Sequence, residues 1–143
     1  MDARLEELVE RLARGNVTEV KVVVTTVALA LAIYQLVLIS VVYGKARPGF
    51  LGAGPAAQTH RASGDAIAVL LIVVALMCAS YFGIEDDAAF HAVTGAALIA
   101  VLALKVVIIR WWHSAGRFLP VLGISVFVLL AATWASTAGA FLA

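Results

Sequence analysis

Two histidines open successive membrane-length apolar segments with the same local pattern. His60 is followed four residues later by Gly64, and His91 by Gly95, with a hydroxyl residue before each glycine. Histidine is rare inside lipid because each ring nitrogen needs a partner there. On a helix, residues four apart lie on one face, about 40° apart, and a glycine leaves a flat gap beside the imidazole. A porphyrin needs such a gap when its iron binds an imidazole nitrogen, so the pattern predicts haem binding.

The chain is apolar enough to lie within a membrane along nearly its whole length. Of its 143 residues, 64% are hydrophobic and 13% are charged, and the mean hydropathy is +1.05. A soluble domain carries roughly twice that charged fraction. We therefore expect an all-α membrane protein, a four-transmembrane-helix up-down bundle that forms one domain over residues 19–143. Four stretches reach the length of about 20 residues that a spanning helix needs: Val20–Tyr43, Ala62–Phe82, Ala88–Trp112 and Phe118–Leu142.

Residues 1–18 are expected to form a short amphipathic helix at the membrane interface. Gly15 and Asn16 follow this segment as a stop signal. The alternative is a solvated helical cap rich in Glu–Arg pairs. The first apolar stretch is too long for the core of a cleavable signal peptide. The apolar residues of the segment recur at helical spacing: Leu5, Leu8, Val9 and Leu12.

Charge and cysteine content exclude several classes of function. The net charge of +1 gives no basis for binding nucleic acid. Cys78 is the only cysteine, so one chain can form neither an internal disulfide nor a cysteine-ligated cluster. The covalent attachment motif Cys-x-x-Cys-His is missing from the sequence as well. A bound haem is therefore expected to be non-covalent haem b.

Four crossings place both termini on one side of the membrane, which we call side B. The loops after the first and third helices then lie on the opposite side, side A. The positive-inside rule favours side A as the cytoplasmic side of a bacterial cytoplasmic membrane, by a narrow margin. Side A carries five basic residues, namely Lys45, Arg47, Arg61, Arg110 and Arg117, and side B carries four, namely Arg4, Arg11, Arg14 and Lys21.

The depth of each histidine restricts which pairs can share an iron. His60 begins the second helix on side A, and His91 begins the third helix on side B. His113 ends the third helix about 33 Å further along, back on side A. His60 and His113 therefore share a surface and are predicted to ligate one haem, with Arg61 and Arg117 near its propionates. Alternatively, His113 is an interfacial anchor within an aromatic belt.

His91 has no second histidine on side B. Met77 lies at a compatible depth, and a thioether and an imidazole can together ligate haem iron. Met77 is rotated about 100° from His60 around the second helix, however. His91 residues of two chains in a homodimer are another pairing. The expected haem content is therefore one or two, and the alternative use of Gly64 and Gly95 is close helix packing.

Other polar residues within the spans have two explanations each. Lys105 lies on the same face of the third helix as His91, at a depth that matches Asp65. An ion pair between Lys105 and Asp65 is expected, and the alternative is that Lys105 extends to the membrane surface. Tyr34 and Gln35 could line a cofactor or quinone pocket, or make an interhelical hydrogen bond.

Short motifs along the chain resemble small four-helix bacterial membrane proteins similar to the cytochrome b561 and ferric-reductase-like transmembrane class. The resemblance implies haem b binding and electron transfer, with His60 and His91 at the matching positions. A histidine often precedes the helix-two cysteine in this class, where the present chain has Met77, and His113 lies outside the pattern. The motifs are Tyr34-Gln35-Leu36, Val42-Tyr43-Gly44, Thr59-His60-Arg61-Ala62-Ser63-Gly64, Phe90-His91-Ala92-Val93-Thr94-Gly95, Leu104-Lys105-Val106 and Leu119-Pro120-Val121-Leu122-Gly123.

The sequence thus favours a membrane-embedded b-type cytochrome that carries electrons within or across the membrane. It would serve as an oxidoreductase or an electron-transfer subunit, with the lipid bilayer, a quinone or a redox protein, and a second copy of itself as candidate partners. The alternative is a haem-free structural or assembly subunit of a respiratory membrane complex. A small transporter ranks third, because the sequence has no pair of broken helices.

Overall fold

The computed structural model describes residues 4, 7, 11, 16–82 and 89–142. All regular structure within these residues is helical, and four helices are long and apolar enough to cross a membrane. The predicted class, an all-α membrane bundle with several crossings, is confirmed. The long helices are α2 (Val17–Val42), α3 (Ala53–Met77), α4 (Ala89–Arg110) and α5 (Leu119–Leu142), joined by a π-helical segment η1 (Cys78–Phe82) and a 3-10 helix η3 (His113–Phe118).

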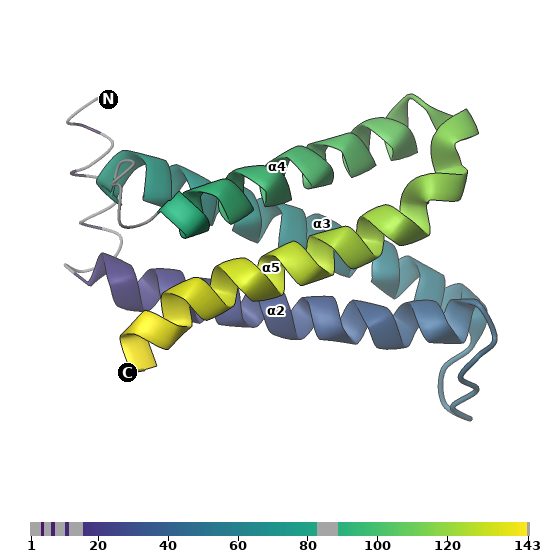
Figure 1. The fold of residues 1–143 in the computed structure, drawn as a ribbon. Helices are drawn as coiled ribbons and strands as arrows, with labels where there is room; N and C mark the ends of the chain where they lie inside the picture. Colours follow the sequence, from purple (N-terminus) through teal and green to yellow (C-terminus); the bar gives the residue numbers. More distant parts are fainter. Residues whose placement is uncertain (1–3, 5–6, 8–10, 12–15, 83–88, 143) are drawn as a thin grey trace.

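Successive long helices run in opposite directions, so the bundle consists of two antiparallel hairpins (Figure 1). Helix α2 packs along α3, and α4 packs along α5. The hairpins meet mainly where α2 contacts α5, whereas α3 and α4 touch over a short stretch. The start of α2 and the end of α5 lie at the same end of the bundle, as predicted for side B.

The start of α2 is fixed by a capping interaction. Asn16 is the N-cap residue, and its side-chain oxygen accepts a hydrogen bond from the Glu19 amide at 3.2 Å. The Glu19 carboxylate in turn accepts from the Asn16 side-chain amide. The first of these bonds satisfies one of the backbone donors that a helix start leaves open, and the second holds the two side chains together. Consequently α2 begins at Val17, three residues before the predicted Val20.

Only part of the predicted N-terminal helix falls within the described residues. Arg4, Glu7 and Arg11 are helical and exposed, and Arg11 forms an ion pair with Glu7 at 2.6 Å. The apolar residues Leu5, Leu8, Val9 and Leu12, on which the prediction of an amphipathic helix depends, lie outside the described residues. The interfacial helix over residues 1–18 therefore stays a prediction.

Helix α3 begins at Ala53, nine residues before the predicted Ala62. The predicted start was too late, because a proline before the apolar stretch need not lie outside the helix. Pro55 occupies the first turn of α3, where its missing N–H removes no intrahelical hydrogen bond. As a result His60 lies about 10 Å inside the helix rather than at its start.

Helix α4 ends at Arg110, two residues before the predicted Trp112. Trp112 departs from helical backbone angles, with φ −117° and ψ 60°, and η3 follows at His113. His113 is therefore not part of α4. The expectation that His113 ends the third helix is wrong, because the α-helix stops at Arg110.

Apolar side chains from all four long helices fill the middle of the bundle. Leu130 of α5 is 1% exposed, and it lies in the central cluster with small residues of α2. Large apolar residues such as Val23, Ile72 and Val128 are at least half exposed on the outer faces. A soluble protein of this size does not expose apolar side chains on every helix, so these faces suit lipid. The central cluster contains Ala28, Ala32, Ile67, Leu71, Leu98, Val126 and Leu130.

Candidate functional site

Polar side chains collect in the interior at two levels, one on each side of the central apolar cluster. On side B the polar residues come from α2, η1, α4 and α5, and on side A they come from α2, α3 and α4. We call the first group the side-B cluster, which consists of Lys21, Cys78, His91, Thr133, Ser136 and Thr137. The second is the side-A cluster, which consists of Gln35, His60, Ser63 and Lys105.

The imidazole of His91 is held by two hydroxyls of α5. Its Nδ1 lies 3.0 Å from Ser136 Oγ and 3.1 Å from Thr137 Oγ1. Both hydroxyls donate their own proton to the Thr133 carbonyl oxygen, at 2.8 and 3.1 Å. When both hydroxyls donate to this carbonyl, their oxygens accept from His91, and the hydrogen of the neutral ring is on Nδ1. Nε2 of the neutral ring then holds the lone pair and is the nitrogen able to bind a metal.

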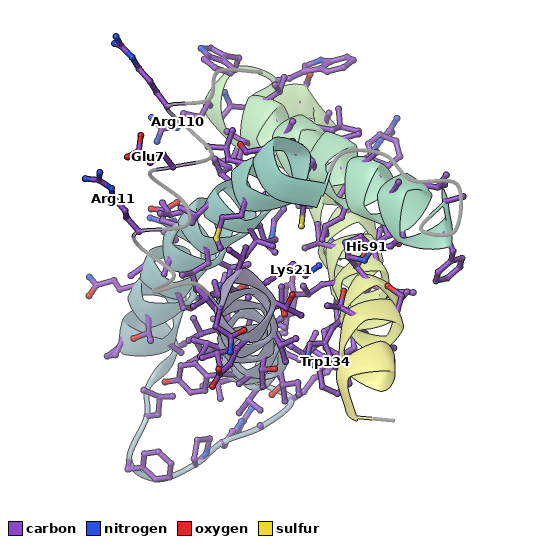
Figure 2. The ribbon with its side chains drawn as sticks, turned by 90° about the vertical axis from the view of Figure 1, so that its left-hand side faces the viewer. Glu7, Arg11, Lys21, His91, Arg110 and Trp134 are labelled. Atoms are coloured by element: carbon purple, nitrogen blue, oxygen red, sulfur yellow. The ribbon has the colours of Figure 1, made fainter. Side chains whose placement is uncertain are left out.

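Lys21 lies in the interior beside this imidazole. Its side chain is 9% exposed, and its charge acts on both His91 and Cys78. Figure 2, which views the bundle from the end that carries the chain termini, shows Lys21 of α2 and His91 of α4 directed into the same space beside α5.

The side chain of Met77 is accounted for by apolar packing. It is 8% exposed and packs with Val17 and Val20 near the start of α2. Directly after it, the backbone changes to the π-helical turn η1, which begins at Cys78. Single π-turns are rare and frequently occur at functional sites. The pairing of Met77 with His91 on one iron stays a prediction.

The two His-x-x-[Ser/Thr]-Gly motifs have the same local structure but different tertiary surroundings. In each, the hydroxyl bonds the carbonyl four residues earlier, at 2.7 Å for Ser63 and 2.8 Å for Thr94. A Cβ atom added to Gly64 would lie 3.1 Å from the Gln35 amide nitrogen, whereas one added to Gly95 would meet nothing within 4 Å. The gap beside Gly64 is therefore filled, and the gap beside Gly95 is open.

Gln35 connects α2 to the first half of α3. Its amide nitrogen donates to the His60 carbonyl oxygen at 2.8 Å and to Ser63 Oγ at 3.0 Å. The interhelical hydrogen bond expected for Gln35 is thus present. Tyr34 next to it is exposed, so it does not line an interior pocket.

His60 and Lys105 face each other within the side-A cluster. The charge of Lys105 acts on His60, and Lys105 is half-buried. His60 Nδ1 is buried without a hydrogen-bond partner. Asp65 is exposed, and the two described side chains Lys105 and Asp65 form no ion pair. The predicted Lys105–Asp65 pair is therefore wrong, because Asp65 lies on the outer face of α3 while Lys105 lies beside His60.

The remaining predicted site residues lie at the surface of side A. His113 is exposed on η3, and Arg61 is exposed on α3. The guanidinium of Arg117 lies 4.8 Å from the centre of the Phe118 ring. No hydrogen bond joins His113 to His60 in the described structure. The bis-histidine pair of His60 and His113 stays a prediction.

Sequence reasoning missed the partners of His91. Ser136 and Thr137 lie outside the motifs found in the sequence, and Lys21 was considered only as one of the basic residues of side B. One signal could have identified them: antiparallel neighbours place the end of the fourth helix beside the start of the third. The part of the chain that the structure describes holds no group of three or more His, Cys, Asp or Glu side chains able to hold a metal ion. A haem iron needs only one or two protein ligands, because the porphyrin ring supplies its other four ligands, which are nitrogens.

Comparison with known proteins gives one family and no function. A family model described as "Family of unknown function (DUF6529)" matches residues 7–143, which is nearly the whole chain. No curated protein and no solved structure matches the sequence.

Proposed function

The chain belongs to the DUF6529 family, and we propose from the geometry of the side-B cluster that it is a membrane-embedded b-type cytochrome. The observation that carries the proposal is the fixed orientation of His91. Ser136 and Thr137 engage Nδ1 and leave Nε2 free of hydrogen bonds to the residues described. Histidines that bind metals are held in this way by a partner on the other ring nitrogen.

The residues around His91 fit the chemical groups of a haem. His91 would supply an axial nitrogen, and the open face at Gly95, one turn further along α4, leaves room beside the imidazole. Lys21 of α2 lies beside the imidazole at this end of the bundle. Haem b would supply one-electron transfer. The sixth iron position would be filled by Met77, by a histidine of a second copy, or by neither.

Side A offers a weaker case for a second haem. The space beside Gly64, which the ring would need, holds the Gln35 amide. His113 lies on η3 rather than on α4. We therefore assign the first haem to His91 and retain the pair of His60 and His113 as the candidate for a second one.

The cellular setting of this proposal follows from the sequence. Its resemblance to the cytochrome b561 and ferric-reductase-like class supports a role as an electron-transfer subunit in the bacterial cytoplasmic membrane. A quinone or a redox protein would exchange electrons with the haem. These assignments depend on haem binding and are tested only after it.

The deciding experiment is an absorption spectrum of the detergent-purified protein from haem-replete cells, oxidised and then reduced with dithionite. We expect a Soret band and reduced α-band absorption typical of haem b. His91→Ala should remove the main haem, whereas His113→Ala serves as the matched histidine control and should retain it. A wild-type protein with no Soret band and no extractable haem would refute the proposal.

A haem-free structural subunit is the second candidate, and one observation favours it. The His60 motif packs α3 against α2 through the contacts of Gln35 with the His60 carbonyl and Gly64. If both motifs serve packing, the purified protein would lack haem and would instead co-purify in fixed stoichiometry with subunits of a larger membrane complex.

A further inference from the structure

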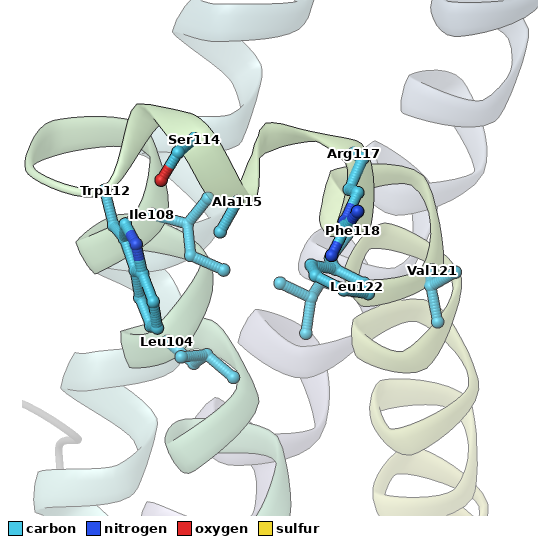
Figure 3. A pocket seen from close by; sticks show the side chains of 9 residues that line it. All are labelled: Leu104, Ile108, Trp112, Ser114, Ala115, Arg117, Phe118, Val121 and Leu122. Carbon is cyan, nitrogen blue, oxygen red and sulfur yellow. The ribbon is translucent and has the colours of Figure 1, made fainter.

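A groove opens at the side-A end of the bundle, where α4, η3 and the start of α5 meet, and we call it the side-A groove. Its volume is about 560 Å³, which lies within the roughly 300–1,000 Å³ of small-molecule sites. Figure 3 shows apolar side chains around it and Arg117 at one edge. The apolar lining consists of Leu104, Ile108, Trp112, Ala115, Phe118, Val121 and Leu122.

The position of the groove places it at the boundary between lipid tails and headgroups. It spans the last turns of α4 and the first turns of α5, where these spanning helices end. Trp112, which lines it, is more than half exposed. Tryptophans concentrate at the depth of the headgroups. The apolar walls thus face acyl chains, and the Arg117 edge faces headgroups.

Arg117 is the charged group of the side-A groove. Its guanidinium lies over the Phe118 ring at 4.8 Å, a cation–π contact that restrains an otherwise flexible side chain. Arg117 forms no ion pair with any acidic side chain that the structure describes. The surrounding sequence is basic as well, since Asp65 is the only acidic residue in 43–65 and 104–118. The groove edge therefore has a positive charge available to an anion.

We propose that the side-A groove binds an anionic phospholipid, with an acyl chain along its apolar lining and the phosphate-containing headgroup at Arg117. An arginine forms paired hydrogen bonds with phosphate oxygens, and one basic residue near the surface strengthens binding to anionic lipid about fivefold. A zwitterionic lipid fills the same apolar space but gains less from Arg117. The groove thus selects lipids by headgroup charge, independently of whether haem binds at His91.

Native mass spectrometry of protein reconstituted with phosphatidylglycerol and phosphatidylcholine tests this proposal. Wild-type protein should retain phosphatidylglycerol preferentially, and Arg117→Gln should reduce that preference about fivefold. Arg117→Lys, which keeps the charge, should preserve most of it. Arg47→Gln is the matched control, because Arg47 is an exposed arginine on the same side of the membrane, and it should leave the preference unchanged.

A second variant tests the groove itself. Val121 lines the groove and is 63% exposed, so Val121→Trp can fill the space without disturbing the bundle interior. It should lower the retention of both lipids while circular dichroism stays unchanged. Equal losses from Arg117→Gln and Arg47→Gln, no headgroup preference in the wild type, or normal lipid retention by Val121→Trp would each overturn the proposal.

Discussion

Substituting alanine for each of the two motif glycines should give opposite results. Gly64→Ala places a Cβ atom 3.1 Å from the Gln35 amide nitrogen, whereas Gly95→Ala places one in open space. Both glycines lie inside long helices, so both changes share a gain in helix propensity of up to about 1 kcal/mol. That shared gain cancels when the two variants are compared with each other. Measured on haem-free protein, their difference in stability therefore reports the Gln35 contact, without the stability that bound haem would add.

The size of this difference follows from the hydrogen bonds at risk. Gln35 donates to the His60 carbonyl and to Ser63 Oγ, and a hydrogen bond between membrane helices contributes about 0.6 kcal/mol on average. Gly64→Ala should thus be less stable than Gly95→Ala by about 1 kcal/mol. Reversible unfolding in mixed SDS–detergent micelles measures the free energy of each variant.

Two further measurements complete this test. In protein that already carries Gln35→Ala, adding Gly64→Ala should cause no further loss of stability from this contact, because the added Cβ then meets no amide. Gly95→Ala should lower the haem content per protein, because its Cβ would narrow the gap proposed for the ring, while Gly64→Ala should not. Equal stability of the two alanine variants would refute the packing argument, and normal haem content in Gly95→Ala would refute the assignment of its gap to haem.

Three other outcomes are expected. Ser136→Ala combined with Thr137→Val should weaken haem affinity about 10- to 100-fold in a haem titration, because the ligand imidazole loses the groups that orient it, and unchanged affinity would contradict this. Lys105→Gln and Asp65→Asn should have additive effects on the unfolding free energy to within about 0.5 kcal/mol, since the two side chains form no ion pair. A coupling free energy above that value would show that the two side chains interact. Asn16→Ala should destabilise the start of α2 by about 1 kcal/mol, measured by the same unfolding assay, and no change would mean that the cap is dispensable.

The two histidine motifs separate what local sequence predicts from what it does not. Each motif lies on a helix, as expected, and each hydroxyl bonds the carbonyl four residues before it. These features depend only on residues within one turn. The difference between Gly64 and Gly95 depends on whether a polar side chain of another helix reaches the gap. Gln35 of α2 reaches the gap beside Gly64. The sequence of α3 alone does not identify Gln35 as the residue that fills this gap.

Helix boundaries limited the other predictions. The start of α3 was expected nine residues too late because Pro55 acts as a first-turn residue. Because α4 ends before Trp112, His113 does not belong to the same helix as His91. An α-helix turns by about 100° per residue, so an interrupted helix invalidates any argument about which side chains share a face.

The sequence by itself determined four membrane-length helices, the antiparallel order that places both termini on one side, and the opposite depths of His60 and His91. Apolar length and chain connectivity are sufficient for these conclusions. Only the tertiary structure decided how each helix is rotated toward its neighbours. That rotation brings Ser136, Thr137 and Lys21 to His91 and turns Asp65 away from Lys105. The physical reason is that helices with apolar residues all round carry little directional information, so a few interhelical polar contacts and close glycine approaches set their orientation.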